Sequence, residues 1–141
     1  MVFGTFDIVH DGHRHLLREA AEMGDEVVVV VSRDEHVLEL KGTLPMNRLA
    51  DRMEAVSCES EVTEVIAGDD ELGTYGVLVE HEPHTILLGY DQDDLKESIA
   101  TWMSEQGVKT ISCTYASAYM PDLFNTTRIV EQMQNEEMSV L

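Results

Sequence analysis

The sequence predicts an α/β fold in which helices cover both faces of one doubly wound, five-stranded parallel sheet. Short apolar segments bounded by glycine or polar residues alternate with segments whose apolar residues recur every three or four positions, the pattern of strands alternating with helices. The valines at 27–31 are typical of a strand buried on both faces between helical layers. Because 141 residues fit one domain with one core, we expect a single Rossmann-like domain over residues 1–141.

The first elements are a short strand and a long amphipathic helix. The strand is apolar up to Gly4, and a polar loop separates it from the helix. Gly24 ends that helix, and the valine strand at 27–31 follows, with a short helical stretch after it. The apolar face of the long helix is formed by Leu16, Leu17, Ala20, Ala21 and Met23.

The middle of the chain is predicted to form a helix, a strand and a second helix. Pro45 is expected at the start of the first of these helices, where the missing N–H of proline costs nothing. Arg48 and Arg52 are four residues apart, so we expect them together on one face of it. A short third strand is expected at 62–67, and a helix at 72–81.

The last part of the chain is predicted to form two more strands and two helices. A strand at 85–88 precedes a helix that Gly107 stops, and a fifth strand is expected at 108–113. A final helix is expected to begin near Asn125. The helix before Gly107 carries a regular apolar stripe of Leu95, Ile99, Trp102 and Met103.

The net charge is the most unusual bulk property. Twenty-eight acidic residues face nine basic ones, a formal net charge of −19, and the acids are spread over the whole chain. Such a polyanion repels nucleic acid, so we expect no nucleic-acid partner. At molar salt the Debye length falls to about 3 Å, which screens this repulsion. We interpret the surface as adapted to high salt; an acidic protein that needs divalent cations is the open alternative.

We expect a cytoplasmic protein without a membrane partner. No apolar run approaches the roughly 18 residues of a membrane span, and the first strand leaves no room for a signal peptide. Cys58 and Cys113 are far apart, so we expect two free thiols in a reducing compartment rather than a disulfide.

The loop after the first strand carries the most specific motif. Gly4 follows the apolar start, and His10 and His13 lie where the helix is expected to begin. A helix N-terminus offers unpaired N–H groups and a positive dipole end, which suit phosphate. Neither G-x-x-x-x-G-K-[ST] nor G-x-G-x-x-G occurs in the sequence. Two alternatives are a pair of capping or solvated histidines and a zinc site from His10, His13 and His15, for which no convergent Cys or Glu is nearby.

Residues 4–13 resemble the G-T-F-D-x-x-H-x-G-H signature of the cytidylyltransferase-like nucleotidyltransferase superfamily. The resemblance extends along the chain, because Asn125-Thr126-Thr127-Arg128-Ile129 resembles the terminal S/N-T-T/S-x-I motif of these enzymes. It implies transfer of a nucleoside monophosphate from a triphosphate to a phosphorylated acceptor, with release of pyrophosphate. Asp11 departs from the pattern, which usually has proline or an aromatic there, and it places a carboxylate beside the expected triphosphate.

The resemblance also implies roles for individual residues. His10, His13 and Lys41 are implied to be catalytic, and Lys41, Arg48 and Arg52 to bind the acceptor. A substrate-bridging Mg²⁺ is expected, with most of its ligands from substrate and water and no dedicated protein metal site. Asp7 or Asp11 as an additional ligand is an open alternative, although Asp7 is expected instead to orient the loop. The implied nucleotide-binding residues are Gly4, Thr5, Phe6, His10, Asp11, Gly12, His13, Gly89, Tyr90, Asp91, Asn125, Thr126 and Thr127.

Two sub-families compete. Gly89-Tyr90-Asp91-Gln92 looks more like archaeal FAD synthetase, which adenylates FMN with ATP. The arginine of the R-T-x-G-I-S-T ending of glycerol-3-phosphate cytidylyltransferases is missing, since Tyr119-Met120-Pro121-Asp122 occupies that approach. We favour ATP and FMN as substrates; CTP with glycerol 3-phosphate is the alternative, and a non-catalytic nucleotide-binding module is a third. Family habit implies a homodimer.

Overall fold

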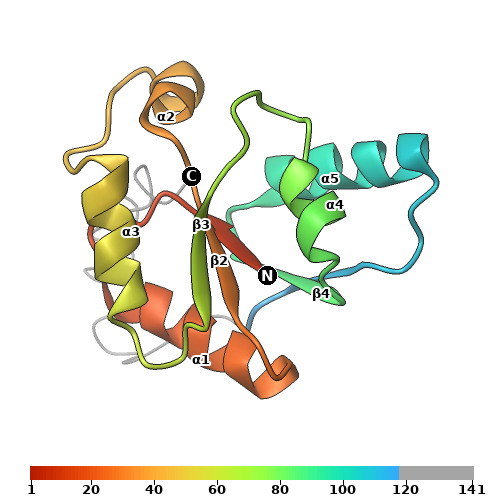
Figure 1. The fold of residues 1–141 in the computed structure, drawn as a ribbon, viewed down its shortest axis with the longest axis horizontal. Helices are drawn as coiled ribbons and strands as arrows, with labels where there is room; N and C mark the ends of the chain where they lie inside the picture. Colours follow the sequence, from red (N-terminus) through yellow and green to blue (C-terminus); the bar gives the residue numbers. More distant parts are fainter. Residues whose placement is uncertain (118–141) are drawn as a thin grey trace.

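The computed structural model describes residues 1–117, which form a five-stranded sheet with helices on both faces (Figure 1). All strand pairs are parallel, as predicted. Within these residues no helix is both long and apolar enough to cross a membrane. The elements are β1 (Val2–Gly4), α1 (Asp11–Met23), β2 (Val28–Val31), α2 (Asp34–Lys41), α3 (Leu49–Ser57), β3 (Glu64–Ala67), α4 (Gly76–His81), β4 (Thr85–Leu88), α5 (Asp93–Gln106) and β5 (Ser112–Tyr115).

The strand order is β3-β2-β1-β4-β5, so β1 lies at the centre of the sheet. The chain builds outward from β1 to β3, then returns to the other side of β1 with β4. Val2 pairs with Val29 on one side and with Leu87 on the other. The order of strands therefore reverses between β1 and β4, and the carboxyl ends of these two strands form the crevice where such sheets bind ligands.

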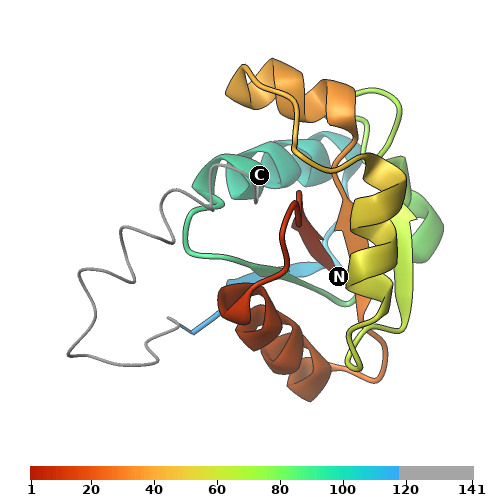
Figure 2. The same ribbon diagram turned by 90° about the vertical axis from the view of Figure 1, so that its left-hand side faces the viewer.

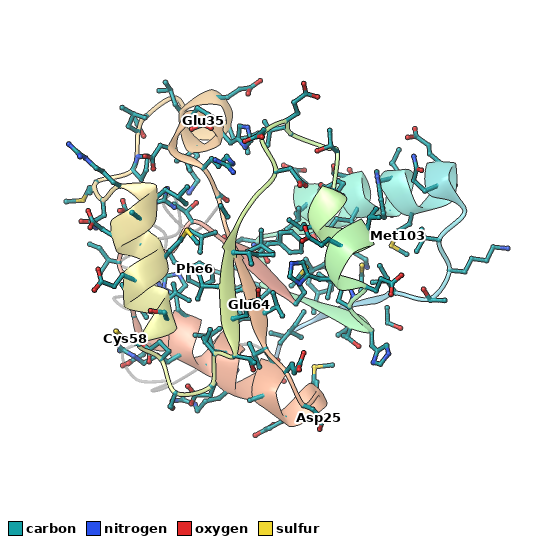
Figure 3. The ribbon with its side chains drawn as sticks, viewed as in Figure 1. Phe6, Asp25, Glu35, Cys58, Glu64 and Met103 are labelled. Carbon is teal, nitrogen blue, oxygen red and sulfur yellow. The ribbon has the colours of Figure 1, made fainter. Side chains whose placement is uncertain are left out.

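Two separate apolar cores hold the helices on the sheet. One face packs α1 and α3 against β2 through Leu17, Val29 and Val56. The opposite face packs α4 and α5 through Leu78 and Ile99. The remaining helix, α2, lies beyond the carboxyl ends of the strands in both ribbon views (Figures 1 and 2). Figure 3 shows side chains filling the space between the sheet and its helices. The doubly wound prediction is confirmed.

The fifth strand lies further along the chain than predicted. It spans Ser112–Tyr115 instead of 108–113. Val108 follows α5 and caps its last turn, since its N–H donates to the carbonyl of Met103 (2.9 Å). The pairing starts where the Ser112 N–H donates to the His84 carbonyl (2.9 Å). Residues 108–111, in which only Val108 and Ile111 are apolar, therefore lead into the strand without being part of it.

The helix expected to begin at Pro45 begins four residues later, at Leu49. The backbone N–H groups of Met46 and Asn47 donate to the carboxylate of Asp7, which holds the preceding residues as a loop. The helix expected at 72–81 is also shorter, because Tyr75 has a left-handed φ of 47° and the helix begins after it. The predicted last helix lies outside the described residues.

Candidate active site

The two motif histidines close the N-terminus of α1. His10 is the N-cap, and its Nδ1 accepts a hydrogen bond from the backbone N–H of Gly12 (3.1 Å). The backbone N–H of His10 donates in turn to Nδ1 of His13 (3.1 Å). The rings stack with centroids 3.8 Å apart. This is a capping box built from two imidazoles, where serine or threonine with glutamate is usual. The capping alternative is thus correct for the two Nδ1 atoms, and the capping bonds do not involve the two Nε2 atoms.

The capping bonds determine which ring nitrogen carries the proton. Because both Nδ1 atoms accept from backbone N–H groups, each neutral imidazole is protonated at Nε2. The Nε2 atoms of His10 and His13 are both buried, as is Oγ1 of Thr5. Within residues 1–117, His13 Nε2 and Thr5 Oγ1 have no hydrogen-bond partner. Buried polar groups normally have a hydrogen-bond partner, so His13 Nε2 and Thr5 Oγ1 are placed to bind a polar ligand.

His13 is neutral at ordinary pH. Burial, with smaller contributions from nearby His10 and Arg14, lowers the pKa of its imidazole from 6.5 to about 3, while a hydrogen bond to the Ile8 backbone acts in the opposite direction. A neutral imidazole with a fixed tautomer acts as a hydrogen-bond donor of constant charge. His13 is therefore suited to stabilising negative charge on a ligand and unsuited to general acid–base catalysis near pH 7.

Gly4 and Phe6 pack next to the two histidines. A Cβ on Gly4 would lie 2.7 Å from Cε2 of Phe6, so only glycine fits there. Phe6 itself has a left-handed φ of 53°, which is rare for a bulky residue. Its ring is buried and lies 4.9 Å from the ring of His13, centroid to centroid. Gly4 was expected to bind the nucleotide, which stays a prediction; what the structure shows is that the absence of a side chain at Gly4 makes room for the Phe6 ring.

Asp7 fastens the loop, as predicted. Its carboxylate accepts from the backbone N–H groups of Met46 (2.7 Å) and Asn47 (2.8 Å), which joins the loop after β1 to the connection between α2 and α3. Asp11 is turned toward Arg14, with its Oδ1 3.1 Å from Nη1 of Arg14. Part of the negative charge that this departure introduces is thus paired with a neighbouring cation.

Lys41 and Asp91 meet at the crevice from opposite sides. Lys41 is the last residue of α2, and Asp91 follows β4. Burial lowers the pKa of the Lys41 ammonium to about 8, against the opposing influence of Asp91 and Asp7. Burial raises the pKa of Asp91, and Lys41 opposes this shift. Lys41 therefore lies near the loops that follow both β1 and β4, where it was expected to act.

Arg48 and Arg52 are not together on one helix face. Arg48 is the N-cap of α3 and is exposed. Arg52 is 1% exposed, and its guanidinium donates to three groups of the protein. These are the carbonyl of Thr5 (2.7 Å), the carbonyl of Asn47 (3.0 Å) and Oδ1 of Asp34 (2.5 Å). The guanidinium of Arg52 thus holds the loop after β1 in place instead of facing an open acceptor site.

The loop after β4 contains one exposed and one buried member of the predicted motif. Tyr90 is exposed, whereas Gln92 is buried and links the loop after β4 to β1. Nε2 of Gln92 donates to the carbonyl of Phe3 (2.8 Å), and its Oε1 accepts from the N–H of Gly89 (2.9 Å). Gln92 therefore fixes the crevice between β1 and β4.

Sequence reasoning missed Asn47, the partner of Asp7. A polar residue in a loop carries no local signal for a contact forty residues away. Gly12 lies in the first turn of α1 and donates its N–H to His10, as described above. Asn125, Thr126 and Thr127 lie outside the described residues. The last described residue, Ser117, is bound to α1 through Glu19, whose Oε2 accepts the Ser117 N–H (2.8 Å).

The zinc alternative finds no support in the described residues. Among residues 1–117 no three His, Cys, Asp or Glu side chains are grouped as a metal site. His15 does not join His10 and His13, because its Nε2 lies 3.1 Å from the carbonyl of Ser117.

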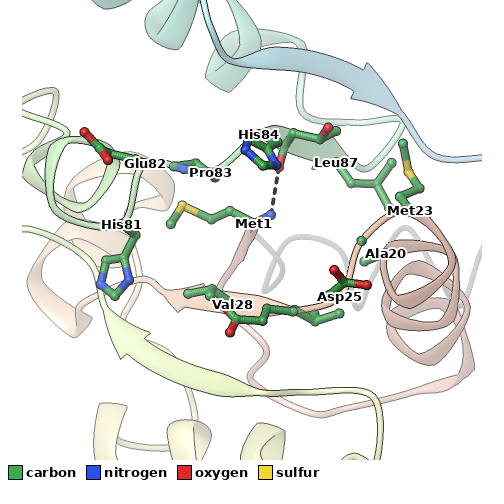
Figure 4. A pocket seen from close by; sticks show the side chains of 14 residues that line it. Met1, Ala20, Met23, Asp25, Val28, His81, Glu82, Pro83, His84 and Leu87 are labelled. Carbon is green, nitrogen blue, oxygen red and sulfur yellow. Dashed lines mark hydrogen bonds between the residues drawn. The ribbon is translucent and has the colours of Figure 1, made fainter.

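A cavity of about 350 Å³ lies at the opposite, amino-terminal edge of the sheet (Figure 4). It is lined by the end of α1, the start of β2 and residues 81–85. The amino group of Met1 donates to the carbonyl of Thr85 there (2.8 Å). None of the motif residues lines this cavity. Since ligands of doubly wound sheets bind at the carboxyl ends of the strands, the histidine crevice is the candidate site.

Known proteins resemble the chain over nearly its whole length. Residues 1–132 match the family model described as cytidylyltransferase-like. The FAD synthase of Thermococcus sibiricus is 32% identical over 130 residues, which cover 92% of this chain and 88% of that protein. The FAD synthase of Halorhabdus utahensis is 36% identical over 134 residues, covering 92% of each chain.

A solved structure has the same fold. The lipopolysaccharide core biosynthesis protein from Thermoplasma volcanium superposes with a TM-score of 0.75 at 32% sequence identity, covering 85% of this chain and 96% of that one. The sequence motif, the strand order and these similarities agree: the chain belongs to the cytidylyltransferase-like family.

Proposed function

We propose that the protein is an FMN adenylyltransferase, which transfers AMP from ATP to FMN, forms FAD and releases pyrophosphate. The observation that carries the proposal is the pair of buried Nε2 atoms of His10 and His13, held as donors at the start of α1. The choice of substrates is supported by the relatives named FAD synthase, which match over 92% of this chain. Residues 1–141 act as one nucleotidyltransferase domain in this proposal.

The reaction needs no protein nucleophile. A phosphate oxygen of FMN attacks the α-phosphorus of ATP, a new P–O bond forms, the bond to the bridging oxygen of the β-phosphate breaks, and pyrophosphate leaves. Positioning and stabilisation of charge then provide the catalysis. The Nε2–H groups of His10 and His13 donate to phosphate oxygens as charge builds on them, next to the positive end of the α1 dipole. The Lys41 ammonium adds a positive charge on the acceptor side.

Other residues hold the two substrates. Thr5 and Phe6 offer backbone groups to the nucleotide, and Tyr90 and Asp91 contact its nucleoside. Lys41 and the exposed Arg48 bind the acceptor phosphate. Arg52 is reassigned from direct acceptor binding to positioning, because its donors are occupied within the protein. The remaining nucleotide-binding residues of the proposal are Gly4, Asp11, Gly12, Gly89, Asn125, Thr126 and Thr127.

A divalent cation, Mg²⁺, fits the proposal only as a substrate-bridging ion. Both carboxylate oxygens of Asp7 already accept hydrogen bonds, so Asp7 is not a free ligand. Mg²⁺ usually keeps several waters and binds through substrate phosphates, and when bound it neutralises charge on the triphosphate. The protein groups around it act on the remaining phosphate oxygens.

The proposal also places the enzyme in a reducing, salt-rich cytoplasm as a homodimer. Cys58 and Cys113 are free thiols, which suits a reducing compartment. The net charge of −19 suits high salt. The dimer rests on family habit alone, and sedimentation velocity at high salt tests it.

The experiment incubates the protein with ATP or CTP and with FMN or glycerol 3-phosphate, at high and low KCl, and measures pyrophosphate and the separated products. We expect FAD as the main product. His10→Ala and His13→Ala each lower turnover by about 10²–10³, the usual effect of one lost donor to transition-state charge. His84→Ala is the matched control, because this exposed histidine lies at the opposite edge of the sheet. CDP-glycerol as main product, or near-normal turnover in the double histidine variant, contradicts the proposal.

A further inference from the structure

Four large apolar side chains are exposed beside the candidate site. Ile8 is 52% exposed in the loop after β1, and Leu40 is 62% exposed near the end of α2. Leu44 and Met46, in the connection from α2 to α3, are 61% and 82% exposed. We call these four residues the apolar shelf. Grouped exposed apolar side chains, unlike isolated ones, mark binding surfaces.

The charge of this segment is opposite to that of the rest of the protein. The chain has 28 acidic residues in 141, yet residues 40–50 contain no aspartate or glutamate and two basic residues, Lys41 and Arg48. On a polyanionic surface such a segment attracts an anion that the remaining surface repels. Its chemistry, apolar with two cations, matches a ligand that has both a phosphate and a large apolar body.

The shelf is continuous with the catalytic crevice. The Met46 N–H donates to the Asp7 carboxylate (2.7 Å), and Ile8 follows Asp7 directly in the chain. Lys41 follows Leu40 in the chain, and its ammonium interacts electrostatically with the carboxylates of Asp7 and Asp91. In Figure 2 the connection from α2 to α3 passes beside the carboxyl end of β1. A ligand on the shelf can therefore place a phosphate at Lys41 without leaving the shelf.

We propose that the apolar shelf binds the tricyclic isoalloxazine ring of the acceptor FMN, with the FMN phosphate directed to Lys41. This inference rests on the proposed function and extends it by naming the residues that select the acceptor. A flavin ring covers apolar side chains and releases water from them, whereas glycerol 3-phosphate has no apolar body to do so. The shelf therefore selects FMN over small polar acceptors.

The test replaces shelf side chains without touching the phosphate site. Met46→Ser and Leu44→Ser keep the backbone N–H that Asp7 needs and remove exposed apolar groups, so the fold is preserved. Val79→Ser is the matched control, since Val79 is 64% exposed on α4, which covers the other face of the sheet from α3. The measurements are KM for FMN, KM for ATP, kcat, and FMN affinity without ATP from quenching of flavin fluorescence.

We expect each shelf variant to raise both KM and Kd for FMN about tenfold, within the range for removing a few methylenes from an apolar subsite. KM for ATP and kcat stay unchanged, and Val79→Ser behaves as wild type. If the wild type makes FAD but the double variant binds FMN normally, the inference about the apolar shelf is overturned and the proposed function is unaffected. A wild type that quenches flavin but makes no FAD contradicts the proposed function instead.

The competing occupant of the shelf is a second copy of the chain. Sedimentation of the double variant distinguishes the two. A loss of dimer with normal FMN affinity assigns the shelf to a subunit interface and overturns the inference. An unchanged association state with weakened FMN binding supports it.

Discussion

Asp7 and Asn47 are joined by three hydrogen bonds across forty residues of chain. Oδ1 of Asp7 accepts from the Asn47 backbone N–H (2.8 Å) and from its Nδ2 (3.1 Å). Nδ2 also donates to the Asp7 carbonyl (2.7 Å). These bonds tie the loop that leads to His10 and His13 to the connection between α2 and α3.

Asn47→Ala should loosen this link. The substitution removes both Nδ2 bonds and leaves the backbone bond, so we expect a loss of about 1–2 kcal/mol in the free energy of unfolding. KM for the acceptor should rise more than KM for ATP, because the acceptor side of the crevice loses its anchor. Urea unfolding and steady-state kinetics measure both effects. Thr43→Ala, an exposed residue of the same connection, is the control and should change neither quantity. Equal stability of the two variants would refute the anchoring role.

Arg48 and Arg52 should respond in opposite ways to substitution. Arg52→Met leaves Asp34 and two carbonyls without their donor, and we expect a loss of roughly 2–4 kcal/mol in the free energy of unfolding, less than for a fully buried pair because Asp34 is partly exposed. Arg48→Ala should change stability by less than about 0.5 kcal/mol, as exposed substitutions do, and should raise KM for phosphate substrates. Urea unfolding separates the two. A stable Arg52→Met protein with raised KM alone would restore direct substrate binding by Arg52.

The fold could be predicted because its signals are local. The valine run, the apolar stripe of α5 and the glycines that end helices each lie within a few residues, and the parallel topology follows from their alternation. The fifth strand was misplaced because Val108 and Ile111, which follow a helix-ending glycine, look the same whether they lead into a strand or belong to one. Pairing with β4 decides its position, and that pairing is not written in the segment.

Of the candidate site, only the residues that share a local sequence signal could be singled out from the sequence. His10, His13 and Gly4 lie in one short motif, whereas Arg52 looks like any surface arginine on an amphipathic helix. Its burial depends on Thr5 and Asp34, which the fold brings together from other segments. Single-sequence patterns do not encode such distant contacts.

His13 should make the folded state sensitive to mild acid. Its pKa is lowered to about 3 in the folded protein, so only the unfolded chain takes up a proton there as pH falls below 6.5. Stability is therefore lost on acidification, by about 1.4 kcal/mol per pH unit below the unfolded pKa. Between pH 7.0 and 5.5 the wild type should lose about 1 kcal/mol more than His13→Asn, whose side-chain oxygen keeps an acceptor for the His10 N–H. Urea unfolding at the two pH values measures this difference. If the wild type and His13→Asn lose the same free energy of unfolding between pH 7.0 and 5.5, His13 is not buried in its neutral form.

Lys41 should set the alkaline limit of activity. With a pKa of about 8, its ammonium is charged below that pH and loses its proton above it. If the charge binds the acceptor phosphate, kcat/KM for FMN falls as pH rises through 8, approaching tenfold per pH unit. Lys41→Arg keeps the charge and should move this limb to higher pH, while Lys109→Arg, an exposed lysine, should leave it in place. An unchanged limb in Lys41→Arg would assign the titration to another group.

Salt should stabilise the protein. Twenty-eight acidic residues against nine basic ones repel each other when unscreened, and the repulsion destabilises the compact state. The Debye length falls from about 10 Å at 0.1 M to about 3 Å at 1 M, so the melting temperature should rise from low to molar KCl. Screening can be separated from other salt effects by a variant with less charge. Glu22, Glu39 and Glu54 are exposed, and replacing all three by glutamine should raise stability at low salt and reduce the dependence on KCl. A melting temperature that stays flat or falls with KCl, or a triple variant with an unchanged salt slope, would show that the acidity serves a purpose other than tolerance of high salt.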